Sequence, residues 1–311
     1  MSGSVVILGI YVTDLAFRAQ RMPLLGETVA GSAFAMGPGG KGSNQAVAAA
    51  RAGADVIFCT RIGNDAFGKI AQATWAAEGI TSRASVIDDI ATGAAHIYVD
   101  ENTGGNAIIV AAGAAGTLGP DDVDAIEADI ARAAVFVTQL EQPIPAAKRG
   151  LELARKHGVT TVFNPAPALA LDDYIFPLCD YITPNETEAA ALTGVAVKSV
   201  DDARRAADVL LSKGARAAII TLGEAGALLH SASESVLIPA FECGRVVETA
   251  GAGDGFTGGF AAALARGDSA LDAVRFGCAL ASISVTRAGT APSMPRLDEI
   301  NALLSERSVT Q

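Results

Sequence analysis

Two glycine-rich segments of this sequence stand directly before apolar helical segments, and the second of them also carries a carboxylate. That segment, residues 249–259 (TAGAGDGFTGG), places Asp254 at the predicted start of a helix. The backbone amides of residues 250–253 can form a concave nest for an anion. A carboxylate beside such a nest stands where a general base would take the proton from a hydroxyl that attacks a phosphoryl group. A plain helix N-cap is the alternative for Asp254, and the segment alone leaves both open.

The first glycine-rich segment, residues 37–45 (GPGGKGSNQ), runs into a helix predicted over residues 46–52. Its glycines expose backbone amides, while Lys41 and Asn44 offer hydrogen bonds to a polyol or a phosphate. A flexible turn with a helix cap is the simpler alternative. The segment does not fit a Walker A loop, because Gly42 rather than Ser or Thr follows Lys41.

Both segments contain the letters G-x-G-x-x-G, which would suggest a dinucleotide-binding protein such as an NAD-dependent oxidoreductase. Their surroundings argue against that interpretation. Rossmann glycines form the first turn after a buried strand, and the first segment does not occupy that place. The second segment is followed by another long helical segment, residues 271–286, and not by a strand that ends in an acidic residue.

Two further segments carry polar residues at predicted strand ends, the edge at which open α/β sheets place ligands. Residues 183–189 (TPNETEA) hold Asn185 and two glutamates, which either bind a metal or its water or cap the following helix. Residues 221–226 (TLGEAG) either approach a nucleotide or form a tight turn. The cysteines and histidines are scattered without ligand spacing, so neither a zinc site nor a disulfide is predicted.

The elements that must position these segments alternate between short β-rich runs and amphipathic stretches. This order predicts an α/β fold with a mostly parallel sheet covered by helices. The runs 94–100 and 106–110 flank a turn and predict a hairpin, which suggests a small flap inserted into a single domain. The predicted strands are residues 5–8, 56–59, 134–138, 160–163, 181–183 and 217–221. The predicted helices are residues 65–78, 120–131, 145–157, 185–192 and 201–212.

Composition narrows the range of possible partners. The 311 residues include 34 acidic and 23 basic side chains, which gives a formal net charge of −11, and half of the residues are hydrophobic. These values exclude a disordered chain and argue against a nucleic-acid-binding protein, which needs clustered Lys and Arg. No apolar run is long enough to span a membrane and no signal peptide is evident, so a cytoplasmic protein is expected.

Together, these segments resemble the pfkB-type carbohydrate kinase family, and more narrowly its ribokinase branch. The resemblance extends from Gly9 to about Leu304, and its segments are GGKGSNQAVAAARAGA, TQLEQP, NPAPA, TPNETEA, TLGEAG, AGAGDGFTGG and VTRAGTAPSMP. It implies a ribokinase-like three-layer α/β/α fold in one domain, residues 1–311, with a small β lid formed by about residues 10–36 and 92–110. It also implies a homodimer that associates through the lid.

The same resemblance implies an ATP- and Mg²⁺-dependent kinase that transfers the γ-phosphoryl group to a primary hydroxyl of a small sugar, with ribose as the leading candidate. Asp254 would be the catalytic base, and the amides of Gly251, Ala252 and Gly253 would hold the transferred group. The implied sugar-binding residues are Asp14, Gly40, Lys41, Asn44, Glu141 and Asp254. The implied nucleotide-binding residues are Asn185, Thr221, Gly223, Gly226, Gly253 and Cys278. Glu188 would hold Mg²⁺ through water, and a monovalent cation such as K⁺ would lie near Glu248, Ala250, Ser284, Arg287, Gly289 and Ser293.

Three positions depart from the family pattern. Val12 stands where ribokinases carry an Asn, and its side chain cannot hydrogen-bond a hydroxyl. This departure leaves another sugar, a ketosugar acid or a nucleoside as an alternative substrate. Glu248 replaces the usual Asp before the glycine loop, so activation by K⁺ is open. Cys278 stands near the adenine position, where the family often has Asn or His.

Overall fold

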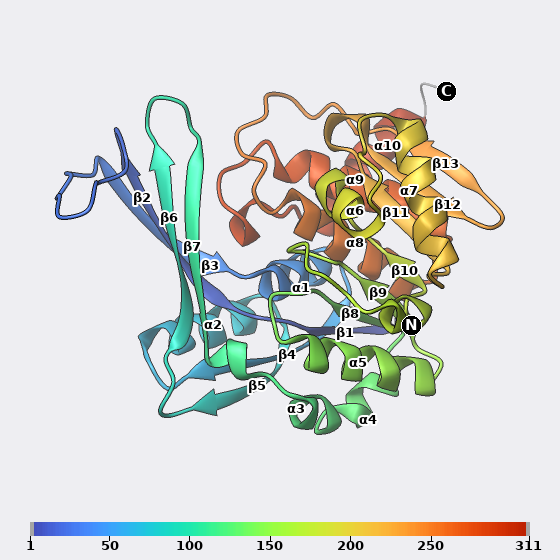
Figure 1. Ribbon diagram of the computed structural model, residues 1–311, viewed down its shortest axis with the longest axis horizontal. Helices are drawn as coiled ribbons and strands as arrows, with labels where there is room; N and C mark the ends of the chain where they lie inside the picture. The colour runs from blue at the N-terminus through green and yellow to red at the C-terminus, as the bar shows by residue number, and fades with distance from the viewer. Residues whose placement is uncertain (1–2, 309–311) are drawn as a thin grey trace.

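The computed structural model describes residues 3–308, so the first two and the last three residues of the predicted domain lie outside the described residues. Its main body is a nine-stranded sheet with helices on both faces (Figure 1). The strands of this sheet are β1 (Ser4–Leu8), β4 (Asp55–Gly63), β5 (Thr81–Ile87), β8 (Val135–Thr138), β9 (Thr160–Phe163), β10 (Tyr181–Ile182), β11 (Ala217–Thr221), β12 (Ala227–Ser231) and β13 (Ser235–Ile238).

The prediction of an α/β fold with a mostly parallel sheet is confirmed. The strand order is β13-β12-β11-β10-β9-β8-β1-β4-β5, and the pairs from β11 to β5 are parallel. Strands β12 and β13 extend the sheet in antiparallel pairing. All six predicted strands are present, and β5, β12 and β13 were not predicted. Strand β5 lies at the sheet edge with mostly exposed side chains, so it lacks the continuous apolar run of a strand buried on both faces.

The predicted helices are present in the predicted order, with two differences in their bounds, and the last helix of the chain, residues 297–308, was not predicted. The predicted helix 120–131 is two short helices, because Ile126 leaves the helical conformation between them. The helix predicted from residue 46 begins already at Lys41, because Gly40 takes a φ of 86° and forms its N-cap. The helices are α1 (Lys41–Arg51), α2 (Ala66–Ala77), α3 (Pro120–Asp124), α4 (Glu127–Ile130), α5 (Ile144–Lys156), α6 (Glu186–Thr193), α7 (Val200–Ser212), α8 (Ala252–Arg266), α9 (Ala270–Ser284) and α10 (Leu297–Ser308). Short 3₁₀ turns are η1 (Ala114–Thr117), η2 (Asp173–Leu178), η3 (Gly223–Ala225) and η4 (Ala291–Ser293).

A second, four-stranded sheet projects from the main body, at the left of Figure 1. Its order is β3-β2-β6-β7, in which β2 and β6 are parallel and the other pairs antiparallel. The predicted hairpin is confirmed as β6 paired with β7. The strands of this sheet are β2 (Val12–Ala19), β3 (Ala33–Gly39), β6 (Thr92–Asp100) and β7 (Asn106–Gly113).

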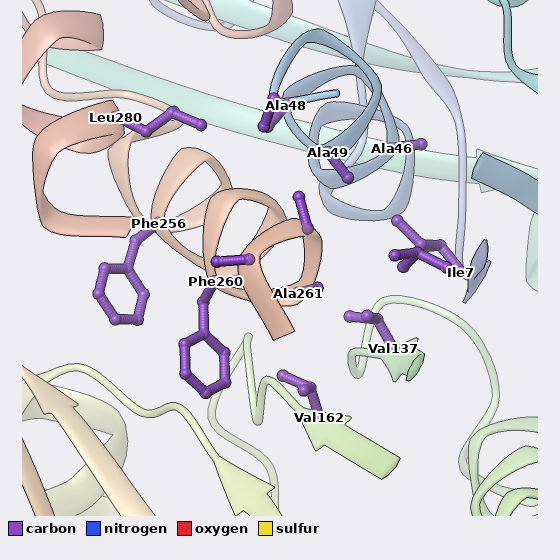
Figure 2. Packing of buried hydrophobic residues seen from close by; sticks show 14 of the residues in the cluster. Ile7, Ala46, Ala48, Ala49, Val137, Val162, Phe256, Phe260, Ala261 and Leu280 are labelled. Carbon is purple, nitrogen blue, oxygen red and sulfur yellow. The ribbon is translucent and has the colours of Figure 1, made fainter. Parts of the chain in front are cut away.

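Successive residues of the central strands point into two separate apolar layers. Val5 and Ile7 of β1 join the layer that contains α1, α8 and α9, whereas Val6 and Leu8 join the layer that contains α3, α5 and α7. Figure 2 shows the first layer, in which Phe260 and the alanines of α1 pack over Ile7, Val137 and Val162. This alternation places helices on both faces of the sheet, and the parallel strand direction brings the carboxyl ends of the strands to one edge.

Small residues let α1 and α8 approach each other closely. A Cβ atom added at Gly258 of α8 would lie 2.5 Å from the carbonyl oxygen of Gln45 and 2.7 Å from the Cβ of Ala48. The Ala- and Gly-rich composition therefore serves helix packing as well as loop conformation. Between residues 3 and 308, no helix combines the length and apolar character needed to cross a bilayer.

Candidate active site

A pocket of about 210 Å³ lies at the carboxyl edge of the parallel strands. Polar side chains reach it from the ends of β9, β10 and β11 and from the first turns of α1, α6 and α8. Ligands of open α/β sheets bind at this edge. The lining residues are Lys41, Asn164, Ala166, Thr183, Asn185, Glu188, Thr221, Thr249, Gly251, Gly253, Asp254 and Thr257.

Asp254 is the third residue of α8 and is only 6% exposed. Its Oδ2 accepts a hydrogen bond from Asn44 Nδ2 at 3.0 Å, and its Oδ1 accepts one from Gln45 Nε2 at 3.2 Å. The N-cap of α8 is Gly251, with a φ of 80°. The N-cap alternative for Asp254 is therefore wrong, and the two glycine-rich segments, far apart in the sequence, meet at its carboxylate.

The turn that opens α8 presents backbone to the pocket. Gly251 and Gly253 line it, and no heavy atom lies within 4 Å of the position that a Cβ of Gly253 would take. The first N–H groups of a helix have no intrahelical partner and carry its positive dipole end, so they favour an anion. The Ala252 N–H instead donates to the Thr249 carbonyl at 3.2 Å, and Ala252 does not line the pocket. This N–H, predicted to face the transferred group, is used within the loop.

Two further buried carboxyl groups lie near Lys41 or Asp254: Glu141 near both, and Asp14 near Asp254. The Lys41 N–H donates to Glu141 Oε2 at 2.7 Å, and the nearby Asp254 carboxylate raises the pKa of the Lys41 ammonium group. Burial raises the pKa of Glu141 to about 7 and that of Asp14 to about 6. The Asp14 carboxylate packs onto Gly39, where an added Cβ would lie 2.1 Å from Oδ1.

The sugar-binding residues implied by the resemblance thus gather around one end of the pocket. Lys41 and Asp254 line it directly. The other four lie next to these two. Asn44 and Glu141 form hydrogen bonds with them, Asp14 interacts electrostatically with Asp254, and Gly40 precedes Lys41 in the sequence.

Asn185 and Glu188 form a capping box at the start of α6. Asn185 Oδ1 accepts from the Glu188 N–H at 2.8 Å, and Glu188 Oε2 accepts from the Asn185 N–H at 2.9 Å. Helix capping is therefore confirmed for this pair, and both side chains also line the pocket beside Thr221. Burial raises the pKa of the Glu188 carboxyl group.

The other implied nucleotide-binding residues lie away from the pocket lining. Gly223 and Gly226 have φ values of 52° and 99° and form the turn between β11 and β12. Cys278 is 5% exposed within the apolar layer around α8 and α9, and burial raises the pKa of its thiol to about 12. Its position is that of a core side chain.

The residues present suit a magnesium ion held mainly by a bound ligand. One Glu188 oxygen is engaged by the Asn185 N–H, and no group of three or more His, Cys, Asp or Glu side chains among residues 3–306 could hold a metal by itself. Mg²⁺ usually keeps several waters and binds one or two carboxylates together with substrate phosphates. Glu188 fits that role through water.

The residues implied for a monovalent cation are partly engaged with one another. Glu248 Oε2 accepts from the Gly289 N–H at 2.8 Å. Ser284 Oγ donates to the Ala281 carbonyl, and the Arg287 guanidinium pairs with the Glu299 carboxylate. Ser293 Oγ likewise donates to the Thr290 carbonyl at 2.7 Å, and the backbone of Ala250 belongs to the same loop as Glu248.

The model of the pfkB family carbohydrate kinases matches residues 2–297. The chain belongs to this family. It is 40% identical over 300 residues to a protein named ribokinase from Haemophilus influenzae, covering 96% of this chain and 97% of that one. It is 36% identical over 303 residues to a deoxyribokinase from Salmonella typhi, covering 97% and 98%. The structure of Arabidopsis thaliana ribokinase complexed with ribose and ATP superposes with a TM-score of 0.89 at 28% identity, covering 98% of this chain and 99% of that one.

Several pocket residues of this carbohydrate kinase were not predicted from sequence. Asn164 and Thr183 follow β9 and β10 directly, so the strand-end rule that selected Asn185 and Thr221 would also have found them. Thr249 and Thr257 flank the glycine loop and line the pocket, and Gln45 contacts the Asp254 carboxylate without lining it. All three lie within the two glycine-rich segments, but no residue type or spacing there singled them out from their neighbours.

Proposed function

We propose that this carbohydrate kinase transfers the γ-phosphoryl group of ATP to a primary hydroxyl of ribose. The observation that carries the proposal is the Asp254 carboxylate, held by two side-chain amides beside the open N-terminus of α8. Family membership, the similarity to a protein named ribokinase and the similarity to a structure with ribose and ATP support the two substrates.

Asp254 would remove the proton from the sugar hydroxyl as its oxygen attacks the γ-phosphorus. The new O–P bond forms as the bond between the γ-phosphorus and the bridging oxygen of ADP breaks. The N–H groups at Gly251 and Gly253, fixed before the reaction, would stabilise the charge on the transferred group. The Lys41 ammonium adds a positive charge on the same side of the pocket.

The sugar would bind between the pocket and the four-stranded sheet, with Asp14, Lys41, Asn44 and Glu141 as its hydrogen-bonding partners. We infer that this sheet is the lid and covers the sugar. ATP would lie along Asn185 and Thr221, with Mg²⁺ at Glu188 through water. The metal supplies charge neutralisation of the phosphates when bound.

A second candidate substrate is 2-deoxyribose. Val12 is 3% exposed and packs with Ile10, Ala95 and Ala115 in a small apolar cluster beneath the second sheet. It stands on the same face of β2 as Asp14, because alternate residues of a strand share a face. An apolar wall there would suit a sugar that lacks one hydroxyl, and the similarity to a protein named deoxyribokinase favours the same candidate.

A sugar panel tests the proposal. ADP release from ATP would be measured with ribose, 2-deoxyribose, fructose and adenosine at equal concentrations, in KCl and in NaCl. Ribose-dependent ADP release is expected, and stimulation by K⁺ over Na⁺ would support a cation at Glu248. Activity confined to another compound would overturn ribose, and no activity with any acceptor would overturn sugar phosphorylation by this pocket.

Replacement of the base tests the mechanism. Asp254→Asn keeps the shape and can still bond an amide, but it cannot accept the hydroxyl proton. The value of kcat should fall by about a hundredfold or more, while ATP binding measured by titration calorimetry stays close to that of the wild type. Near wild-type turnover in this variant would contradict the assigned role.

A further inference from the structure

Gln45 lies directly behind the Asp254 carboxylate and is fully buried. Its Nε2 donates to Asp254 Oδ1 and to Asn164 Oδ1, both at 3.2 Å. Its Oε1 accepts a hydrogen bond from Gln139 Nε2 at 2.5 Å. Gln45 does not line the pocket, so any effect that it has on a substrate must pass through another residue.

The orientation of this amide is fixed by its surroundings. Asn164 Nδ2 donates to the Thr183 carbonyl at 2.8 Å, which leaves Asn164 Oδ1 as an acceptor only. The ionised Asp254 carboxylate also only accepts. Gln45 must therefore turn its NH₂ group toward both oxygens, since the flipped amide would place its own oxygen against two acceptors. Gln139 completes the arrangement by donating to the oxygen that remains.

We propose that Gln45, oriented by Gln139 and Asn164, is a positioning residue that aims the Asp254 carboxylate and favours its ionised form. The inference rests on the proposed function, because it concerns the base of that reaction. A carboxylate offers about four lone-pair sites. Gln45 takes one on Oδ1 and Asn44 takes one on Oδ2, so the carboxylate cannot rotate freely and keeps lone pairs for a hydroxyl in the pocket.

The charges that face Asp254 make such neutral donors important. Lys41, in the first turn of α1, brings a positive charge near it. Three carboxyl groups also lie near the Asp254 carboxylate and repel it when they are ionised: Asp14 from β2, Glu141 after β8 and Glu188 from α6. Amide donors favour the charged carboxylate without adding a net charge that would attract or repel ATP.

Gln45→Met tests this role, because methionine keeps the length and removes the NH₂ group. The value of kcat should fall by about tenfold to a hundredfold while KM for ATP changes by less than about threefold. The acidic limb of the kcat–pH profile should move to higher pH, because the carboxylate loses a donor that favours its charged form.

The matched control is Gln142→Met. Gln142 is 3% exposed and donates to Thr138 Oγ1 and to the Gln139 carbonyl, both at 2.7 Å, without contacting Asp254. The control should keep the wild-type acidic limb even where its thermal stability falls.

Gln139→Met provides a second, milder test that leaves Gln45 in place. It removes the donor to Gln45 Oε1, so the same limb should move in the same direction by a smaller amount. If Gln45→Met does not fold, Gln139→Met decides alone. An acidic limb that coincides with that of Gln142→Met in every folded variant would overturn the proposal and leave Gln45 as a core side chain. Failure of the proposed function is distinguishable, because the wild-type protein would then release no ADP with any sugar.

Discussion

At the residue scale, the pocket holds more buried carboxyl groups than positive charge to balance them. Among the described residues, Asp14, Glu141, Glu188 and Asp254 interact electrostatically with one another or with Lys41. Such a set suits a polyol, since carboxylates accept hydrogen bonds from hydroxyl groups. Burial raises the pKa of Asp14, Glu141 and Glu188, so ionisation of these three carboxyl groups opposes folding.

Glu141 shows how ionisation of a buried carboxyl group changes the free energy of unfolding with pH. Burial raises its pKa from an ordinary value of 4.5 to about 7. Between these two pH values the folded chain binds more protons than the unfolded chain, so the free energy of unfolding falls as pH rises. Glu141→Gln should therefore be more stable than the wild type at pH 8 by about 1 kcal/mol or more and equal to it near pH 4. KM for the sugar should rise in the same variant.

Urea denaturation at both pH values measures this difference. Glu299→Gln is the control, because its hydrogen bond to Arg287 lowers the pKa of Glu299. For Glu299 the change of stability with pH has the opposite sign, because its ionised form stabilises the fold above its ordinary pKa. The control variant should therefore be less stable than the wild type at pH 8. Equal stability of Glu141→Gln and the wild type at pH 8 would contradict the argument.

Val12 offers a second prediction at this scale. Val12→Asn supplies a hydrogen-bonding group next to the sugar site, so the ratio of kcat/KM for ribose to that for 2-deoxyribose should rise by about tenfold. Steady-state kinetics with both sugars measures it. Val12→Ala is the control, since it enlarges the site without adding a polar group. The same ratio in both variants would show that Val12 does not face the sugar hydroxyls.

At the element scale, the contact between α1 and α8 sets the geometry of the base. Asn44 and Gln45 on α1 reach Asp254 on α8 only because Gly258 lets the two helix backbones meet. Gly258→Ala adds helix propensity worth about 1 kcal/mol, but its Cβ would lie 2.5 Å from a carbonyl oxygen. The steric clash should cost more free energy than the helix propensity contributes, because the backbone of α1 cannot move aside as a flexible side chain can.

We therefore expect Gly258→Ala to destabilise the protein by about 1–3 kcal/mol and to lower kcat, as α1 shifts away from α8. Urea denaturation and kinetics with the preferred sugar provide the two measurements. Gly119→Ala is the matched control, since no atom lies within 4 Å of its added Cβ. Unchanged stability in Gly258→Ala would show that the two helices can separate without cost.

At the scale of the whole molecule, the second sheet carries an unusual share of exposed apolar surface. More of the exposed large apolar side chains lie on this sheet and its β2–β3 loop than on the rest of the described chain. Phe17 contacts Phe34 in a tilted ring arrangement and stacks with His96, so the three rings join three strands, and Ile109 is 65% exposed. Apolar surface gathered in one place on a protein marks an interaction site.

We propose that a second copy of this chain covers that sheet in a homodimer. Sedimentation equilibrium should give a dimer mass for the wild type and a monomer mass for the double variant Phe34→Glu with Ile109→Glu. Leu271→Glu, at an exposed apolar residue of α9, is the control and should remain dimeric. A monomeric wild type at micromolar concentration would contradict the homodimer.

Much of this protein could be predicted from sequence because the signals are local. The central strands are continuous apolar runs in the sequence because both of their faces are buried. The start of α6 is predicted by the four residues of its capping box. The two glycine-rich segments indicated a phosphate site at helix starts, and they carried the family resemblance. An acidic chain can bind ATP in this way, because backbone amides at a helix N-terminus bind phosphate without a cluster of basic side chains.

Only the tertiary structure decided what depends on segments far apart in the chain. Strands β2 and β3 form by pairing with each other, and β2 also pairs with β6, so their own residues give little signal. Helix α1 begins at Lys41 because Gly40 packs against the Ile10 carbonyl, where an added Cβ would lie 2.7 Å away. Asn44 and Gln45 meet Asp254 across 210 and 209 residues of sequence. Capping and burial patterns act within a few residues, whereas these contacts exist only once the sheet has brought the two helices together.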